Sequence, residues 1–337
     1  MTVAAMHSGV DAVPGEVAAA LEAASRILLV GHVTPDADCL GSMGAFKAAL
    51  ESRAKACFAS LPVGSVNRRL AFLAEMAGMT PAMDAEMKRC DLILAVDTAK
   101  ARRVNLDGKL DAYPDVPVLN IDHHATNTRF GNVNWVVATA GSTCELVYRL
   151  LRAADRPITP VTASLLYAGI QTDTLGFSLP TTNASALSAA ADLVASGADV
   201  AEVGERLCRS QRKSDFDLLR VVYANTRLLA DGQLAYSSAS YDEIHSVGCS
   251  AADIDDQINV PRSLNGVRLA MLLTEGNRGK TRVNFRGSGG VTVVELAAEF
   301  DGGGHAQAAG AIIDCRLEEA IQKVLPRAIE HLKKFPT

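Results

Sequence analysis

The strongest constraint on the fold is an alternation, in the first half of the chain, of short apolar runs with longer helix-like stretches. The runs are RILLVGH at 26–32, KACFAS at 55–60, DLILAVD at 91–97 and VPVLNID at 116–122. Such runs are typical of buried strands, whereas stretches between them, such as LGSMGAFKAALESRA, have helical character. Strands that alternate with helices form a parallel sheet covered on both faces. We therefore predict an α/β domain with a doubly wound, mostly parallel sheet.

The second half of the chain follows a different pattern. Ser142 and Glu145 have the spacing of a capping box before one helix, and TPVTASLLYAGIQTDT predicts a second helix with a polar end at 172–174. From about Asn183 to Leu219 the pattern is helical, interrupted by SGAD at 196–199. The predicted domains are 1–185 for the α/β domain, 186–220 for a helical linker and 221–337 for a second, smaller domain.

The smaller domain is predicted to be α+β with a mixed sheet. Its strands are expected at 233–240, 267–275, 280–287 and 310–315, with helices around 288–300 and 317–335. The length of 337 residues also favours two domains over a single core.

Composition limits the classes of partner and compartment. A net charge of −5 argues against a surface that grips long nucleic acid, but it permits a short anionic substrate in a local basic pocket. The seven cysteines form no C-x-x-C pair, which fits reduced thiols in a cytoplasm. No signal-peptide pattern begins the sequence, and no apolar run approaches the roughly 20 residues of a membrane span. We expect a cytoplasmic protein without a membrane partner.

Ionisable residues gather where the predicted elements end. They are His32, Asp36 and Asp38 in GHVTPDADCLGS, Asp97 in AVDTA, Asp122, His123 and His124 in NIDHH, and Asp173 in QTDTLGF. Because ligands of parallel sheets bind beyond the carboxyl ends of the strands, we expect these side chains to converge at one edge. Carboxylates at such density cannot all stay ionised without cations. Imidazole and carboxylate without thiolate suit hard or borderline divalent ions, of which Mn²⁺ is one.

Each of these motifs alone has an ordinary structural interpretation. An isolated H-x-x-x-D-x-D stretch is more often a turn with Asx caps, and a single aspartate after a strand usually caps a turn or helix. The joint occurrence of the motifs in one α/β half is what indicates a metal site.

The order of the motifs resembles that of the DHH phosphoesterase superfamily. The sequence contains H-x-x-x-D-x-D-x-x-G-S, then an aspartate after a strand, then D-H-H, then T-D-T. In addition, FDGGGHAQAAGA at 300–311 resembles the G-G-G-H signature of the DHH-associated C-terminal domain. With the chain length, this points to the NrnA-type branch of oligoribonucleases and pAp phosphatases. The resemblance extends from about Arg26 to Ile313.

The resemblance implies a cofactor of two divalent metal ions, with Mn²⁺ as the expected metal. The implied ligands are His32 and Asp36 for the first ion, Asp38, His123 and Asp173 for the second, and Asp97 for both. Asp122 is implied to orient an imidazole, as a carboxylate beside a metal-bound histidine commonly does. His124 is implied to face the substrate phosphate or to assist the leaving oxygen.

The second domain is expected to supply cationic help for the phosphate, because four ligand aspartates already balance two divalent ions. The candidates are Arg262, Arg286 and His305, with Gly302, Gly303 and Gly304 offering backbone N–H groups without side-chain bulk. By default the arginines would be surface residues and the triple glycine a flexible turn. The resemblance implies that all six contact the substrate.

The implied activity is attack of a metal-activated water on phosphorus. The implied substrates are nanoRNA of a few residues, linear dinucleotides and 3′-phosphoadenosine 5′-phosphate (pAp), and a homodimer is implied by the family alone. Three alternatives stay open: a RecJ-like single-strand exonuclease, a family II-like inorganic pyrophosphatase, and a non-catalytic nucleotide-binding regulator. The exonuclease is disfavoured because its extra nucleic-acid modules are missing here. The G-G-G-H segment argues against the pyrophosphatase, and the full set of metal ligands argues against the non-catalytic regulator.

Overall fold

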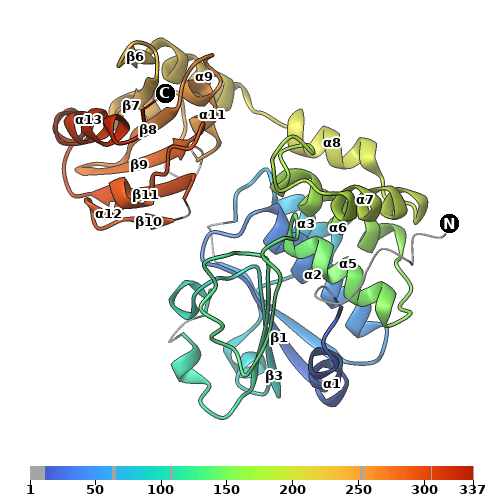
Figure 1. Ribbon diagram of the computed structural model, residues 1–337. Helices are drawn as coiled ribbons and strands as arrows, with labels where there is room; N and C mark the ends of the chain where they lie inside the picture. The colour runs from blue at the N-terminus through green and yellow to red at the C-terminus, as the bar shows by residue number, and fades with distance from the viewer. Residues whose placement is uncertain are drawn as a thin grey trace. The chain divides into compact units, whose positions relative to one another are not determined.

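The computed structural model describes residues 12–62, 66–106, 109–250, 253, 255–304 and 306–336. It divides into two compact units, Met1–Ser210 and Gln211–Thr337, each described by itself below (Figure 1). The boundary lies inside the stretch 186–220 that the sequence analysis assigned to a linker. In the described ranges no helix has both the length and the apolar character needed to cross a bilayer.

The first unit begins with strands and α-helices in alternation and ends with a run of helices; its described residues also include two short 3₁₀ helices, labelled η. Its elements are α1 (Gly15–Ala23), β1 (Arg26–Val30), α2 (Ala37–Glu51), β2 (Ala56–Ser60), α3 (Ala71–Met76), α4 (Asp84–Met87), β3 (Leu92–Val96), η2 (Ala101–Arg103), η3 (Leu110–Ala112), β4 (Val118–Asp122), β5 (Val133–Val136), α5 (Thr143–Ala153), α6 (Pro160–Asp173), α7 (Ala184–Ala195) and α8 (Val200–Cys208). The four strands predicted from the sequence are present within two residues of their expected bounds. Strand β5 was not predicted; it is a four-residue edge strand in which only Trp135 is buried.

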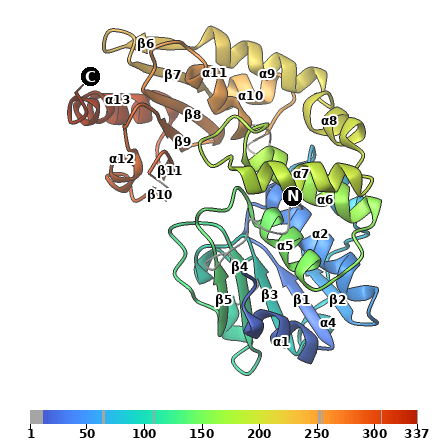
Figure 2. The same ribbon diagram turned by 45° about the vertical axis from the view of Figure 1, so that its right-hand side comes forward.

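The five strands form a parallel sheet in the order β2-β1-β3-β4-β5, which confirms the predicted fold class (Figure 2). Alternate residues of β1 enter different cores, as the period of a strand requires. Ile27 and Leu29 pack with residues of α1, α2 and α5, whereas Leu28 and Val30 pack on the other face with α4, η3 and the loops around them. Burial on both faces explains why these strands are continuous apolar runs.

The strand order reverses between β1 and β3. The chain leaves β1 toward β2 on one side of the sheet and leaves β3 toward β4 on the other. At such a switch point the loops after the two central strands diverge and leave a crevice at their carboxyl ends, where ligands of doubly wound sheets bind.

Helices α2 and α6 lie close together behind this crevice because glycines line their contact. A Cβ atom on Gly41 would lie 2.5 Å from the backbone oxygen of Leu165, and one on Gly169 would lie 2.9 Å from Oδ1 of Asp38. The missing side chains therefore let the end of α6 approach the start of α2.

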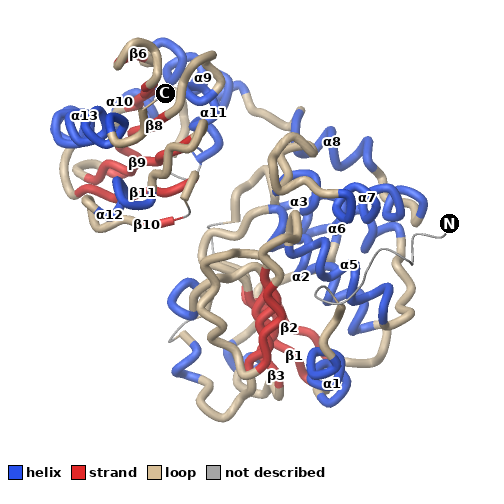
Figure 3. The backbone as a smooth tube through the Cα atoms, in the orientation of Figure 1, coloured by secondary structure: helices blue, strands red, loops and turns tan. Residues whose placement is uncertain are grey.

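The second unit is built on a mixed sheet, as predicted, but the sheet has six strands, of which β6 and β10 were not predicted. Its elements are α9 (Lys213–Ala224), β6 (Arg227–Leu229), β7 (Leu234–Ala239), α10 (Tyr241–Ser246), η5 (Asp255–Ile258), α11 (Asn259–Arg262), β8 (Leu269–Asn277), β9 (Lys280–Gly287), α12 (Val294–Ala298), β10 (Gly303–Gly304), β11 (Ala308–Ile313) and α13 (Leu317–Lys333). The strand order is β10-β11-β9-β8-β7-β6, antiparallel except for the parallel pair β7–β8. Figure 3 shows these strands in red beside α13.

The helix predicted over 288–300 is wrong in its first half. The helix begins only at Val294, because Gly289 and Gly290 have φ angles of 56° and 84°. A right-handed helix requires negative φ, so the chain turns at these glycines instead.

Candidate metal centre

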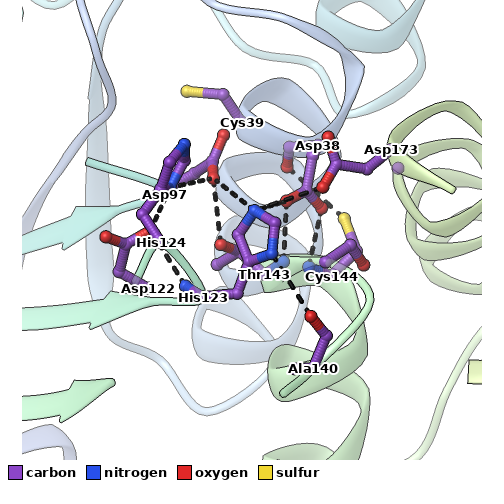
Figure 4. A network of polar contacts seen from close by, with 12 residues as sticks. Asp38, Cys39, Asp97, Asp122, His123, His124, Ala140, Thr143, Cys144 and Asp173 are labelled. Atoms are coloured by element: carbon purple, nitrogen blue, oxygen red, sulfur yellow. Dashed lines mark hydrogen bonds and ion pairs between the residues drawn. The ribbon is translucent and has the colours of Figure 1, made fainter. Parts of the chain in front are cut away.

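The acidic and imidazole side chains of the first unit meet at the switch point of its sheet. His32 follows β1, Asp97 follows β3, and Asp122 ends β4 just before His123 and His124. The start of α2 adds Asp36 and Asp38, and the end of α6 adds Asp173. Figure 4 shows most of them around a common centre.

Asp97 lies between two groups of possible ligands. Its Oδ2 lies 3.6 Å from Nε2 of His32, and its Oδ1 lies 3.7 Å from Nε2 of His123. The side chain is only 2 % exposed, and Oδ1 also accepts a hydrogen bond from the Thr143 hydroxyl. The backbone has a φ of 51°, a left-handed conformation that aspartate tolerates and that is frequent at functional sites.

The first group consists of His32, Asp36 and Asp97. Nε2 of His32 lies 3.7 Å from Oδ2 of Asp36. The other oxygen of Asp36 accepts the backbone N–H of Cys39 and so caps α2. This cap fixes the carboxylate and leaves Oδ2 beside the imidazole.

The second group surrounds His123. Its Nε2 lies 3.1 Å from Oδ2 of Asp173 and 4.0 Å from Oδ2 of Asp38, in addition to its approach to Asp97. Its Nδ1 faces the carbonyl of Ala140 at 3.4 Å (Figure 4). A carbonyl can only accept, so Nδ1 carries the hydrogen and Nε2 is the nitrogen that faces the carboxylates.

Asp38 is held by the start of α5, which sequence analysis missed. Its two oxygens accept the backbone N–H groups of Thr143 and Cys144 at 2.7 and 2.8 Å. The first N–H groups of a helix have no partner within it and carry partial positive charge, so they bind a buried carboxylate well. The capping pattern at Ser142 marked the helix start correctly, and that start is the only sequence signal for this contact.

His124 and Asp122 form a separate pair beside the two groups. Nδ1 of His124 lies 2.7 Å from Oδ1 of Asp122. The side chain of Asp122 is fully buried, and its Oδ2 accepts a hydrogen bond from the side-chain amide of Asn127. Nδ1 of His124 is also 3.6 Å from Asp97, a distance compatible with a shared metal. Because Nδ1 already bonds Asp122, we assign His124 no ligand role.

The electrostatics of the centre require positive charge. Burial and the charge of Asp97 raise the pKa of Asp38 to about 7, and burial with the charges of Asp38 and Asp36 raises the pKa of Asp173 well above its usual range. Burial opposes the charged form of His32, but the carboxylates of Asp36 and Asp97 outweigh it and raise the pKa of that imidazole to about 10. Without cations, the centre therefore holds protons in their place.

Cys39 also lies beside the first group, within the range of a shared ion with His32 and Asp97. Its side chain is fully buried in the core, and burial raises the pKa of the thiol well above its usual range. It therefore packs as a small apolar residue.

A cation near this centre also comes from the first unit itself. Arg103, in η2, places a guanidinium nitrogen 3.5 Å from the hydroxyl of Thr34, in the loop between His32 and Asp36. From the sequence, positive charge for the phosphate was expected only from the second domain. The available signal was the pair Arg102–Arg103 a few residues after Asp97, at the same sheet edge.

In the second unit the structure brings some of the expected substrate contacts together. Arg286 on β9 pairs with Ala308 of β11, and β11 pairs in turn with Gly303 and Gly304 of β10. Arg262 ends α11, a helix that packs on β7 and β8. His305 lies outside the described residues.

Two of the three glycines have packing reasons of their own. A Cβ atom on Gly302 would lie 2.3 Å from the carbonyl oxygen of Gly310, and one on Gly304 would lie 2.4 Å from that of Ala308. Nothing lies within 4 Å of a Cβ atom on Gly303. Of these three glycines, only Gly303 has no packing reason to lack a side chain, so it is the one that can be assigned to ligand binding alone.

Comparison with known proteins identifies the family. The model of the DHH family N-terminal domain matches residues 26–170, and that of the DHHA1 domain matches residues 232–334. The chain belongs to the DHH family. The resemblance inferred from the motifs is thereby confirmed, and the protein is a hydrolase of phosphoester bonds.

Similar DHH proteins cover almost the full chain. The bifunctional oligoribonuclease and PAP phosphatase NrnA of Thermus thermophilus is 29% identical over 91% of this chain and 90% of its own. The protein of the same name from Mycoplasma genitalium is 30% identical over 87% and 90%. Among solved structures, an exopolyphosphatase-related protein from Bacteroides fragilis has a TM-score of 0.85 at 26% identity and covers 95% of this chain and 96% of its own.

Proposed function

We propose that the protein is a two-metal, manganese-dependent phosphoesterase that hydrolyses nanoRNA, linear dinucleotides and pAp. The observation that carries the proposal is the position of Asp97, whose two oxygens face two separate groups of imidazole and carboxylate. One carboxylate between two groups is the arrangement that a bridging ligand needs. The names of the NrnA relatives support the substrate class.

The donor atoms fit a pair of divalent ions. Most of the imidazole–carboxylate distances are 3.6–4.0 Å, longer than a hydrogen bond. Two donors that each lie about 2.1 Å from one cation are about 3–4 Å apart. The proposed ligands are His32 and Asp36 for one ion, Asp38, His123 and Asp173 for the other, and Asp97 for both.

Two ions in these positions would activate water and stabilise charge on the attacking and leaving oxygens. The neighbouring residues perform the remaining steps. Asp122 holds Nδ1 of His124, so Nε2 is the nitrogen available to bind the phosphate or to pass a proton to the leaving oxygen. The guanidinium of Arg103 offers an additional positive charge to a phosphate oxygen.

The second unit is proposed to bind the rest of the substrate. Arg262, Arg286 and His305 would supply positive charge or hydrogen bonds, and Gly302, Gly303 and Gly304 would supply backbone N–H groups. The net charge of −5 gives the chain no general affinity for long nucleic acid. The proposal therefore limits substrates to those that one small site can hold.

The test is hydrolysis in Mn²⁺ of a 5′-labelled RNA ladder, from a dinucleotide to a strand of about 24 nucleotides. Reactions with pAp and with pyrophosphate run alongside. Cleavage confined to the shortest RNAs and pAp supports the proposal. Processive digestion of the longest strand would instead indicate a RecJ-like exonuclease, exclusive pyrophosphate turnover a pyrophosphatase, and nucleotide binding without turnover a regulator.

A further inference from the structure

One face of the second unit's sheet changes character across its width. Residues of β7 and β8, including Ala239 and Leu272, are covered there by α9, α10 and α11. Farther along the same face, β9 and β11 present paired residues: Arg286 with Ala308, Asn284 with Gly310, and Arg282 with Ile312. Ile312 is 66 % exposed, so this part of the face reaches solvent.

Asn284 is the exception among these residues, because it is polar and only 7 % exposed. Its side chain lies over Gly310, where a Cβ atom would be 3.2 Å from Oδ1. In the described ranges its side chain makes no hydrogen bond, and its amide atoms are not among the fully buried ones, so they keep contact with solvent. An amide that bonds nothing in the protein and reaches solvent on an open sheet face is available to a ligand.

The surroundings of the amide are those of a site for a flat group. Gly310 and Ala308 on β11 and Gly303 on β10 have little or no side chain, so this part of the sheet forms a low floor. Arg286 stands on the same face, one pleat along β9 from Asn284. A planar ring can lie on such a floor with its edge toward the carboxamide.

We infer that Asn284 is a specificity-determining residue that hydrogen-bonds the edge of the substrate's nucleobase. The carboxamide offers one acceptor and two donor hydrogens, and every base edge carries complementary groups. The inference rests on the proposed function, because it assumes that a nucleotide is hydrolysed. It adds that the enzyme recognises the base in addition to the sugar phosphate.

The test compares pAp with the abasic ribose 3′,5′-bisphosphate in wild type, Asn284→Ala and Asn284→Asp. For pAp, kcat/KM of Asn284→Ala should fall about ten- to hundredfold through KM, whereas the abasic substrate should be hydrolysed equally by both proteins. Asn284→Asp keeps the shape of the side chain but loses the N–H donors, so it should also prefer pAp over the abasic substrate less strongly than the wild type does. Asn277→Ala, at the exposed end of β8, is the matched control and should change neither substrate.

Thermal unfolding separates a binding role from a structural one. Because the amide has no partner to lose, Asn284→Ala should unfold at the wild-type temperature within a few degrees. An equal loss on the abasic substrate, or no loss on pAp, would overturn the inference. If the wild type hydrolyses neither substrate in Mn²⁺, the proposed function fails instead, and the two failures are thus distinguishable.

Discussion

Oδ1 of Asp122 lies 2.7 Å from Nδ1 of His124, and this contact determines which nitrogen of the imidazole remains available. Burial favours the neutral form of Asp122, but the hydrogen bond and charge of His124 outweigh it and lower the pKa of the carboxyl. The ionised carboxylate keeps the hydrogen on Nδ1, so Nε2 can act on the substrate.

Asp122→Asn should therefore reduce turnover while leaving metal binding intact. The amide can present its nitrogen to Nδ1 and favour the wrong tautomer, so we expect kcat to fall about 10- to 100-fold with a smaller change in KM. Steady-state kinetics with pAp and metal analysis of the purified variant check this. Asp115→Asn, on the exposed surface, is the control, and an unchanged kcat in Asp122→Asn would remove Asp122 from the orienting role.

Asp97→Ala should abolish hydrolysis because it removes the carboxylate between both donor groups. We expect residual activity of at most a few per cent of wild type and fewer than two Mn²⁺ bound per chain, measured by calorimetric titration. The circular dichroism spectrum should remain that of the wild type. Activity above that level with two ions bound would exclude a bridging role.

Much of the centre could be predicted from the sequence because its side chains follow directly on strands. His32, Asp97 and Asp122 end or follow apolar runs, and the edge where parallel strands end is a matter of topology. The contacts that hold Asp38 could not be predicted in this way. They come from backbone N–H groups about 105 residues away in the sequence. Every residue except proline has such a group, so the residue types do not indicate the contact.

The false helix over 288–300 has a different origin. Its apolar residues, such as Val293 and Leu296, do face a core, and this spacing resembles that of a helix. Two glycines at 289 and 290 then place the chain in turns that a helix cannot contain. The position of Asn284 opposite Gly310 could not be predicted either, because the two residues meet only through strand register.

Metal binding should release protons and strengthen as the pH rises. The raised pKa values of Asp38, about 7, and of Asp173 mean that the metal-free centre holds protons that a cation must displace. The apparent affinity for Mn²⁺ should increase from about pH 6 to about pH 8, where the carboxyl of Asp38 loses its proton. Titration calorimetry in two buffers of different ionisation enthalpy measures the release, and identical heats in both buffers would contradict it.

Gly302→Ala and Gly303→Ala should separate packing from binding in the glycine segment. A methyl group on Gly302 would meet the carbonyl oxygens of Gly310 and Ala297 at 2.3 and 2.7 Å, so we expect a loss of about 1–3 kcal/mol in the free energy of unfolding. At Gly303 the space is open, and stability should stay within about 0.5 kcal/mol of wild type. Denaturant unfolding measures both, and equal losses would contradict the assigned packing.

Arg286→Ala should raise KM for pAp more than it lowers kcat. Arg286 lies half-buried on β9 in the second unit and belongs to neither group of metal ligands, so we expect it to bind ground state and transition state alike. Lys280→Ala removes a positive charge from the exposed start of the same strand and should leave both constants unchanged. The reverse pattern, a large fall in kcat at constant KM, would mean that the guanidinium binds charge that develops only during phosphoryl transfer, and Arg286 would then belong with the catalytic groups.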